Sequence, residues 1–392
     1  MFKEQSTGGF ALPAAVFALV VVGVLVTGGF YLARQETRIG VASERSLEAF
    51  YMAERGANEV MSEWDMSTYG ALTPWTSSYT SKAVDGGVWV AGVTKMTNRL
   101  YLILSQGVLT EGMDVLGYGH RMTAYVARMD SPTMDIGAAL TTIGKLVVGG
   151  SSLINGEDSI PTVWSGLCDA PVAPKPGILI DSLSNITTEG KKHLKKGDPP
   201  VLENNALTSD SLLNYGELLW DDLTGMADKV YSDGQYVKQM HQDSVFINGS
   251  YICATADNWA VPRFNWGDPY NPGGACGSYF PVIHGKGDLI IEASDYGQGI
   301  LLVEGNLTFK GGFEFFGPVI VKGEVITEGT GGHFMGGLVA ANVSLNASSV
   351  LGDAVIQYSS CAVSRAVLNS ALTRVRPLEN RGWVDLSAVI SG

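Results

Sequence analysis

Acidic residues are the most numerous candidates for chemistry in this chain, and they recur through its carboxyl-terminal third. Acid–base catalysis needs carboxylates clustered on one face, whereas these are spread along the sequence as solvated positions would be: Asp288, Glu292, Asp295, Glu304, Glu314, Glu324 and Glu328. Asp221-Asp222 and residues 232–236 lack the alternating oxygen ligands of an EF-hand loop. No GxSxG, HExxH or P-loop motif is present. We therefore expect no catalytic residue, metal site or cofactor.

Four cysteines occur, and none lies in a CxxC or zinc-finger spacing. An even number of cysteines in a chain that lies outside the membrane is typical of disulfides in an oxidising compartment. Three pairings are possible. We favour Cys253–Cys276, because these two bracket one loop rich in Trp, Pro and Gly, and Cys168–Cys361 then follows by elimination.

The loop between Cys253 and Cys276 continues to Phe280 and is rich in aromatic residues. Trp259, Trp266 and Tyr270 are candidate ligand contacts, because exposed aromatic rings can hold a sugar or a partner protein. The alternative is that a disulfide-closed loop packs its own aromatic rings as a small core. We favour this alternative for the loop.

The amino-terminal segment is the element around which the rest is organised. Phe10 to Leu32 is a run of 23 residues without charge, and a helix of this length matches the ~30 Å apolar core of a bilayer. A cleaved secretory signal has a shorter apolar region. Gly8-Gly9 precedes the run, so cleavage there would leave an intact membrane helix spanning residues 10–33.

Charges appear every few residues from Arg34 onward, and residues 30–66 contain no proline. Apolar residues recur at helical spacing, which predicts that the membrane helix continues outward as a half-buried stalk; they are Phe50, Ala53, Ala57, Met61 and Trp64.

The leader ending in Gly9, the Phe10 that follows, and the block Ala49–Met61 (AFYMAERGANEVM) together resemble type IV prepilins, in particular the minor pilins with a PilX-type amino-terminal domain. The resemblance implies that residues 1–9 are a leader removed by prepilin peptidase, with N-methylation of Phe10. It also implies partners: other pilins or pseudopilins and an inner-membrane assembly platform.

One position departs from the pattern of the major pilins. They carry a Glu four residues after that Phe, where this chain has Ala14, preceded by Pro13. The lack of this Glu resembles some minor pilins and the K-type tip pseudopilin of type II secretion. Within the helix, Gly23, Thr27, Gly28 and Gly29 would allow close approach of neighbouring helices. The alternative is a plain, uncleaved single-pass anchor.

Three apolar runs within residues 86–129, separated by turn-rich joints, predict an antiparallel meander. We expect it to pack on the stalk helix, so residues 34–130 would form a pilin-like core. The predicted fold class is therefore α+β: a long amino-terminal helix and an antiparallel sheet, followed by a β-helix-like distal domain with a helical insert.

Residues 137–392 are predicted to form that distal β-rich domain. Gly299, Gly305, Gly311, Gly317, Gly323 and Gly329 are six residues apart, with apolar columns between them, which indicates a β-helix-like solenoid. Strands near 144–156 have the same texture and would join the same body. Apolar spacing over 208–232 predicts a helical insert. The alternative is a β-sandwich with coincidental glycine spacing.

The net charge of −13 disfavours nucleic acid as a partner. The resemblance to minor pilins implies a non-enzymatic minor pilin-like subunit of a type IV pilus or type II secretion pseudopilus. By the resemblance it is a single-pass protein of the cytoplasmic membrane with its body outside, later in the periplasm or a surface pilus. The alternative is an anchored β-helix protein that binds or acts on polysaccharide.

Overall fold

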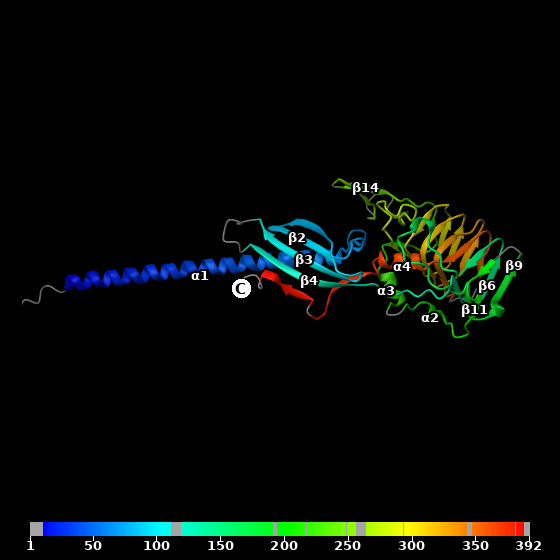
Figure 1. Cartoon of the computed structure of the whole chain (residues 1–392), viewed down its shortest axis with the longest axis horizontal. Coiled ribbons are helices and arrows are strands. Elements are labelled where there is room, and N and C mark those ends of the chain that lie inside the picture. The colour runs from blue at the N-terminus through cyan, green and yellow to red at the C-terminus, as the bar shows by residue number, and fades with distance from the viewer. Residues whose placement is uncertain are drawn as a thin grey trace, which may run out of the picture. The chain divides into compact units, whose positions relative to one another are not determined.

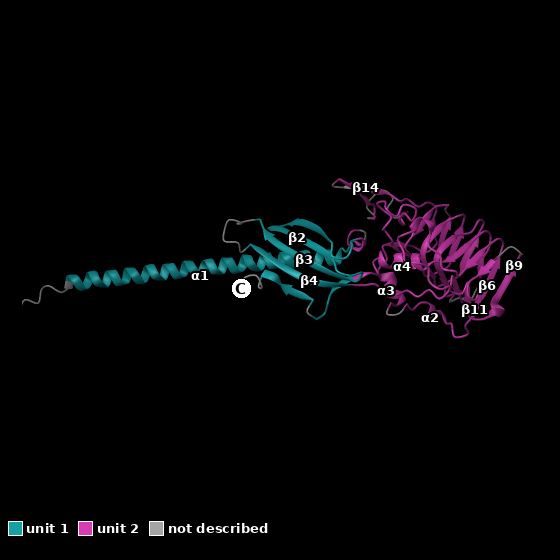
Figure 2. Cartoon of the chain, viewed as in Figure 1, with its two compact units in different colours: residues 1–64, 72–128, 375–392 teal, residues 65–71, 129–374 magenta. Residues whose placement is uncertain are grey.

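The computed structural model describes residues 11–110, 119–190, 194–215, 218–247, 249–255, 264–292, 294–342, 347–380 and 382–387. The chain divides into two compact units (Figures 1 and 2). The first comprises residues 1–64, 72–128 and 375–392, and the second comprises 65–71 and 129–374. Most of the second unit is therefore inserted between two segments of the first.

The first unit combines one long helix with one sheet. Helix α1 (Ala11–Ser62) has 52 residues. The sheet has the strand order β1-β2-β3-β4-β26, and β27 also pairs with β4. Its strands are β1 (Ser77–Val84), β2 (Gly87–Lys95), β3 (Leu100–Leu109), β4 (His120–Asp130), β26 (Arg374–Pro377) and β27 (Trp383–Asp385). Strands β2, β3 and β4 confirm the predicted meander.

The carboxyl half of α1 packs against β2 and β3 of this sheet. Ala49, Ala53 and Ala57 are fully buried there, because small side chains let the helix lie close to the strands. The sheet provides a matching gap at Gly107, where an added Cβ would meet Ala49 O and lie 2.6 Å from Ala53 N. The helical spacing predicted for the stalk is therefore confirmed as far as Met61, whereas Trp64 lies beyond the end of α1.

The last strands return to this first sheet, so the predicted distal domain of 137–392 is too long at its carboxyl end. Val126 N–H donates to Gly382 O (2.7 Å) and Leu378 N–H donates to Val126 O (2.9 Å). These contacts satisfy the backbone of β4, which would otherwise be an unpaired edge. The two strands have only three or four residues each, too few for a clear apolar alternation in the sequence.

Replacing Gly107 with Ala tests the close packing of helix and sheet. The added methyl would collide with helix backbone, which cannot rotate away, so we expect the free energy of unfolding of the first unit to fall by about 1–3 kcal/mol. Gly40→Ala is the matched control, because nothing lies within 4 Å of its added Cβ and Ala favours a helix by about 1 kcal/mol. Urea titration of the detergent-solubilised full chain measures both; equal stability of the two variants would contradict this packing.

The second unit is built mainly from parallel strands in two sheets, seen as stacked arrows in Figure 1. One sheet contains β5 (Leu140–Thr142), β7 (Leu153–Asn155), β8 (Ile178–Ile180), β10 (Leu194–Lys196), β11 (Val201–Glu203), β12 (Lys229–Tyr231), β16 (Val282–Gly285), β18 (Tyr296–Gln298), β19 (Ile300–Val303), β21 (Glu314–Val321), β23 (His333–Ala340) and β25 (Val355–Tyr358). The other contains β6 (Lys145–Gly149), β9 (Ile186–Glu189), β13 (Gln235–Val237), β17 (Leu289–Glu292), β20 (Leu307–Lys310), β22 (Val325–Glu328) and β24 (Ala347–Val350).

In the glycine-rich region, equivalent residues of neighbouring strands lie 18 positions apart in the sequence. The Asn306 N–H donates to Asp288 Oδ1 (2.7 Å) and the Glu324 N–H donates to Asn306 Oδ1 (2.9 Å), each across a separation of 18 residues. Three six-residue blocks thus make one repeat. This parallel pairing fits a solenoid-like unit, as the glycine interval predicted.

One glycine of this interval, Gly317, lies where strand β21 changes its neighbouring strand. Strand β21 pairs with β18 before Gly317 and with β19 after it. Gly317 has φ of 138°, a conformation that side chains disfavour, and an added Cβ would meet Gly299 O on the neighbouring strand. Only glycine can occupy this bend without displacing the backbone beside it.

Paired strands align apolar residues into buried columns. One column passes through six strands, and each member is at most 1% exposed: Ile283, Leu301, Val319, Leu338, Leu140 and Ile178. Residues 140–142 thus pair directly with residues 338–340. Strands β6 and β7, which lie within residues 144–156, likewise pair with β24 and β25. The early strands therefore join the same stack as the carboxyl-terminal ones, as their texture predicted.

The Trp266 side chain fills the space that Gly297 leaves in a second buried column. Gly297 pairs with Phe315 in register but has no side chain, and the Trp266 Cβ lies 2.9 Å from the position that a Gly297 Cβ would take. The Trp266 ring meets Phe313 and Phe315 edge-on at 5.8 and 6.1 Å. It is fully buried, so Trp266 cannot contact a ligand, and the favoured alternative, in which the loop packs its aromatic rings in a core, holds for this residue.

The predicted helix over 208–232 is also wrong. The described residues there form α2 (Ser209–Leu212), α3 (Trp220–Gly225) and the whole of strand β12. The Thr208 hydroxyl caps α2, and the Asp222 carboxylate accepts the Leu219 N–H at the start of α3 (3.0 Å). Strand pairing of Lys229–Tyr231 with β16 replaces the helix, because tertiary pairing outweighs a weak local helix preference.

Other short elements connect and cover the stack. Helix α4 (Ser360–Leu368) lies against β21 and β23. Strands β14 (Ser244–Ile247) and β15 (Ser250–Cys253) form a separate hairpin. A π-helix, η1 (Met66–Gly70), and two 3₁₀ turns, η2 (Thr162–Trp164) and η3 (Leu183–Asn185), complete the described elements.

Trp266→Ala tests the role of that ring in the core. Removing a fully buried Trp leaves a cavity, so we expect the free energy of unfolding of the second unit to fall by about 3–5 kcal/mol. Tyr236→Ala is the control, since that side chain is 48% exposed and its loss should change stability by less than about 1 kcal/mol. Guanidinium titration measures both, and a Trp266→Ala loss as small as that of the control would refute the burial argument.

Candidate assembly surface on the N-terminal helix

The amino half of α1 presents large apolar side chains to its surroundings. They are more than half exposed along one continuous stretch: Leu12, Val16, Phe17, Leu19, Val20, Val22, Val24, Leu25, Val26, Phe30, Tyr31 and Leu32. The most apolar 18-residue window has a mean hydropathy of 2.4, and none of it is buried in this chain. Among the described residues, α1 is the one helix whose length and composition would allow it to cross a membrane.

Small residues interrupt this apolar surface. Nothing lies within 4 Å of a Cβ added at Gly23, Gly28 or Gly29, so another helix can approach the backbone there. The Thr27 hydroxyl donates to Gly23 O (2.7 Å), which satisfies its hydrogen bond inside the helix. A polar residue bonded in this way costs less free energy in an apolar environment.

Two predicted residues of this segment lie at its start. Pro13 and Ala14 are both exposed in α1, and Pro near the first turn of a helix removes no hydrogen bond that the helix needs. Gly9 and Phe10, the predicted processing site, lie outside the described residues.

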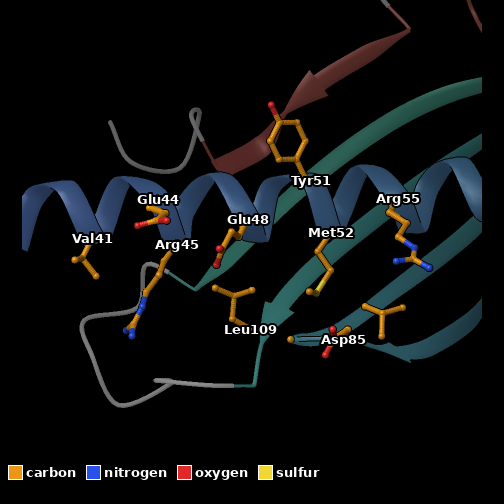
Figure 3. Close-up of a pocket in the computed structure, with 11 residues that line it drawn as sticks. Val41, Glu44, Arg45, Glu48, Tyr51, Met52, Arg55, Asp85 and Leu109 are labelled. Atoms are coloured by element: carbon orange, nitrogen blue, oxygen red, sulfur yellow. The ribbon is translucent and has the colours of Figure 1, made fainter.

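A groove follows where the helix meets its own sheet. It has a volume of about 760 Å³ and is lined by α1, by the turn between β1 and β2, and by the end of β3 (Figure 3). Glu44, Glu48 and Asp85 lie on it beside Arg45 and Arg55. The lining thus contains both acidic and basic groups. These groups could form ion pairs and hydrogen bonds with another molecule next to the apolar stretch.

The carboxyl-terminal strand is held to the helix near this groove by one carboxylate. Glu54 accepts hydrogen bonds from Trp383 Nε1 (2.8 Å) and from the Tyr125 hydroxyl. Burial, and then the bond to Glu54, raise the pKa of Tyr125, which keeps the phenol a donor. Glu54 therefore ties α1, β4 and β27 together.

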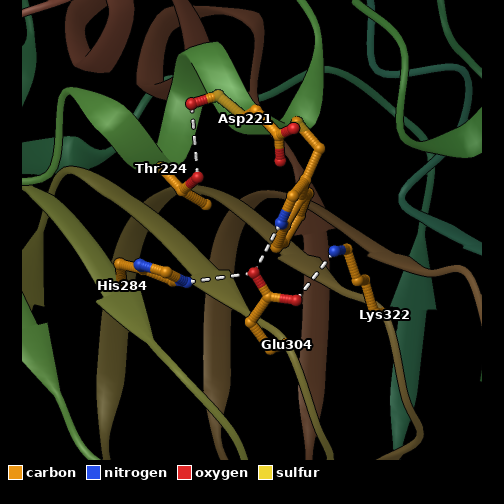
Figure 4. A network of polar contacts seen from close by, with 6 residues as sticks. Asp221, Thr224, His284, Glu304 and Lys322 are labelled. Carbon is orange, nitrogen blue, oxygen red and sulfur yellow. Dashed lines mark hydrogen bonds and ion pairs between the residues drawn. The ribbon is translucent and has the colours of Figure 1, made fainter.

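The second unit contains a polar cluster that has the residue types of a catalytic site. Glu304 Oε1 accepts from Trp220 Nε1 (2.8 Å) and lies 3.3 Å from His284 Nε2, while Glu304 Oε2 accepts from Lys322 Nζ at 2.7 Å (Figure 4). The Lys322 ammonium also lies 4.5 Å from the centre of the Trp220 ring.

The environment of this cluster indicates a structural role. Burial lowers the pKa of His284 despite its contact with Glu304. Burial raises the pKa of Glu304, but the hydrogen bonds from Lys322, Trp220 and His284 lower it by more. The pKa of Glu304 is therefore below its usual value. Both carboxylate oxygens are therefore occupied by protein donors. The cluster holds α3 against the parallel strands, and the sequence did not reveal it because its members are far apart along the chain.

The cysteines form the bonds Cys253–Cys276 and Cys168–Cys361, the two pairings that we favoured. Of the three predicted ligand contacts, Tyr270 is 43% exposed and Trp266 is fully buried, whereas Trp259 lies outside the described residues. Among the described residues, no group of His, Cys, Asp and Glu could hold a metal ion.

No family model matches the sequence, and no curated protein matches it. Among solved structures, the chain is similar to the competence-associated pilin ComZ from Thermus thermophilus. The match has 12% sequence identity and a TM-score of 0.21, and it covers 87% of this chain and 96% of ComZ. A similarity this low does not establish a shared fold, and the resemblance to PilX-type pilins stays a prediction.

His284→Gln tests the polar cluster through pH. Because the pKa of His284 is lowered in the folded state, the unfolded chain binds more protons, and stability falls as pH drops below about 6.5. We expect the variant to reduce the loss of unfolding free energy between pH 7 and 5.5. His241→Gln, outside this cluster, is the control. Denaturant titrations at several pH values measure this; an unchanged slope in His284→Gln would contradict the assignment.

Proposed function

We propose that this protein is a minor pilin-like structural subunit of a type IV pilus or type II secretion pseudopilus. One observation carries the proposal: a continuous helix whose carboxyl half is covered by its own sheet, while its amino half exposes an apolar surface. Apolar surface in water costs about 25 cal/mol per Å². That half must therefore be covered by lipid or by other helices.

A filament subunit uses both kinds of cover in turn. The helix is first stored in the cytoplasmic membrane with the body outside, and then packs among the helices of other pilins or pseudopilins, where the same side chains stay away from water. Gly23, Gly28 and Gly29 support close approach in the second state, since the backbone is open there. The charged groove beside α1 supports polar contacts between subunits at the edge of the apolar stretch.

Processing is the chemical part of the proposal. Prepilin peptidase would cut between Gly9 and Phe10, and Phe10 would become N-methylated. An assembly platform in the inner membrane would then move the subunit into the fibre. Ala14 in place of an acidic residue supports a minor rather than a bulk position, because the subunit lacks the carboxylate that pairs subunits in major pilins.

Mass spectrometry of the amino terminus of the protein from its native host tests this function. We expect N-methyl-Phe10 as the first residue, and co-purification with sheared filaments or with the secretion apparatus. Gly9→Val should retain the leader and lose this co-purification, whereas the matched change Gly40→Val, away from the cleavage site, should still be processed. An intact Met1 in the wild-type protein, with no filament association, would identify a plain membrane anchor instead.

A further inference from the structure

A row of half-exposed polar side chains crosses three neighbouring strands of the second unit. Tyr296 of β18 pairs in register with Glu314 of β21, which pairs with His333 of β23. The following residues on the last two strands, Phe315 and Phe334, are fully buried. Because side chains alternate between the faces of a strand, Glu314 and His333 lie on the outer face. Their side chains are 35% and 42% exposed.

Tyr270 lies over this row with its ring held in one orientation. Its hydroxyl donates to Glu314, and its ring meets Tyr296 at 4.8 Å and Phe316 at 5.7 Å, both edge-on. Even so, 43% of the residue is exposed. The outer face thus presents an aromatic ring, a carboxylate and an imidazole within reach of one small ligand.

The loop that carries Tyr270 is fixed to the body of the unit at several points. Gln298 Nε2 donates to the carbonyl oxygens of Gly277 (3.1 Å) and Tyr279 (2.9 Å). Trp164 Nε1 donates to Pro269 O at 2.8 Å, and the Cys253–Cys276 disulfide closes the loop. A ligand would therefore not have to order residues 264–280, the described part of the loop that carries Tyr270, which saves the entropy that ordering costs.

The chemistry of these groups defines the ligand class. A pyranose ring has an apolar C–H face that packs on a tyrosine ring, and hydroxyls that donate to a carboxylate and accept from an imidazole. The charge of the surroundings disfavours acidic sugars: the chain carries −13, and Asp268 and Asp295 lie near Tyr296, whose pKa is raised by burial and by those carboxylates.

We propose that Tyr270, Glu314 and His333 form a binding subsite for a neutral glycan. Neighbouring parallel strands lie about 4.8 Å apart, so the row Tyr296, Glu314, His333 offers polar groups to successive parts of an extended sugar chain. This role goes beyond assembly of a filament, because none of these residues belongs to α1. A subunit with this site would bring surface polysaccharide to whatever structure α1 joins.

Binding of the detergent-solubilised full chain to a printed array of neutral and acidic glycans tests the subsite. The strongest neutral glycan is then titrated as a soluble tetrasaccharide. We expect Tyr270→Ala to weaken binding at least about tenfold, or 1.4 kcal/mol, and Tyr270→Phe, which keeps the ring, to weaken it much less. Tyr236→Ala is the control, because Tyr236 is similarly exposed but lies on strand β13, outside the row.

Four results would overturn the subsite: no glycan bound by the wild type, binding of acidic glycans alone, unchanged affinity in Tyr270→Ala, or an equal loss in Tyr236→Ala. His333→Ala gives an independent variant if Tyr270→Ala unfolds early in a thermal melt, and it too should weaken binding. Tyr270→Ala should co-purify with filaments as the wild type does. A glycan result can therefore fail while the filament result holds, and the reverse.

Discussion

The rest of this protein depends on one constraint: a long helix that its own sheet covers over only half of its length. Helix α1 is continuous over 52 residues, but its own sheet covers only the carboxyl half. Ala49, Ala53 and Ala57 are buried against β2 and β3, while Phe17, Leu25 and Phe30 remain exposed. No local rearrangement of the described chain corrects this, because the exposed half lies beyond the reach of the sheet strands. The missing cover has to come from other molecules.

The insertion of the second unit follows from the way the first sheet is completed. Strand β4 leads into residues 129–374, and the chain returns only with β26 and β27. Trp383 of β27 reaches Glu54 on α1, so the helix is fully held only after the whole second unit has been made. The buried columns of the parallel strands give this insert a hydrophobic core of its own.

The sequence predicted the parts of the fold that rest on long, regular patterns. Three patterns are long enough to identify an element: the uncharged run from Phe10, the helical spacing through Met61, and the glycine interval that ends at Gly329. The 18-residue repeat itself was not predicted, since only hydrogen bonds such as that from Asn306 to Asp288 show which blocks are neighbours. Patterns show periods, whereas pairing depends on contacts between distant residues.

The errors have the same origin. Leu212, Leu219 and Val230 have helical spacing, yet pairing of Lys229–Tyr231 with β16 divides that segment. Trp266 and Tyr270 are four residues apart in one loop and looked equivalent in the sequence. Gly297, a residue without a side chain on the adjoining strand, decides that Trp266 fills the core.

That difference between two neighbouring aromatic residues also links the stability of the second unit to its surface. Trp266 is bonded to Tyr231 through its indole nitrogen (2.8 Å) and packs among buried phenylalanines. It fixes the backbone from which Tyr270 reaches the outer row of Glu314 and His333. The loop therefore uses one ring to attach itself to the core and the other to present a rigid aromatic face. A face held in this way loses little conformational entropy when it binds, which is the physical condition for a small site to bind a weakly interacting ligand such as a sugar.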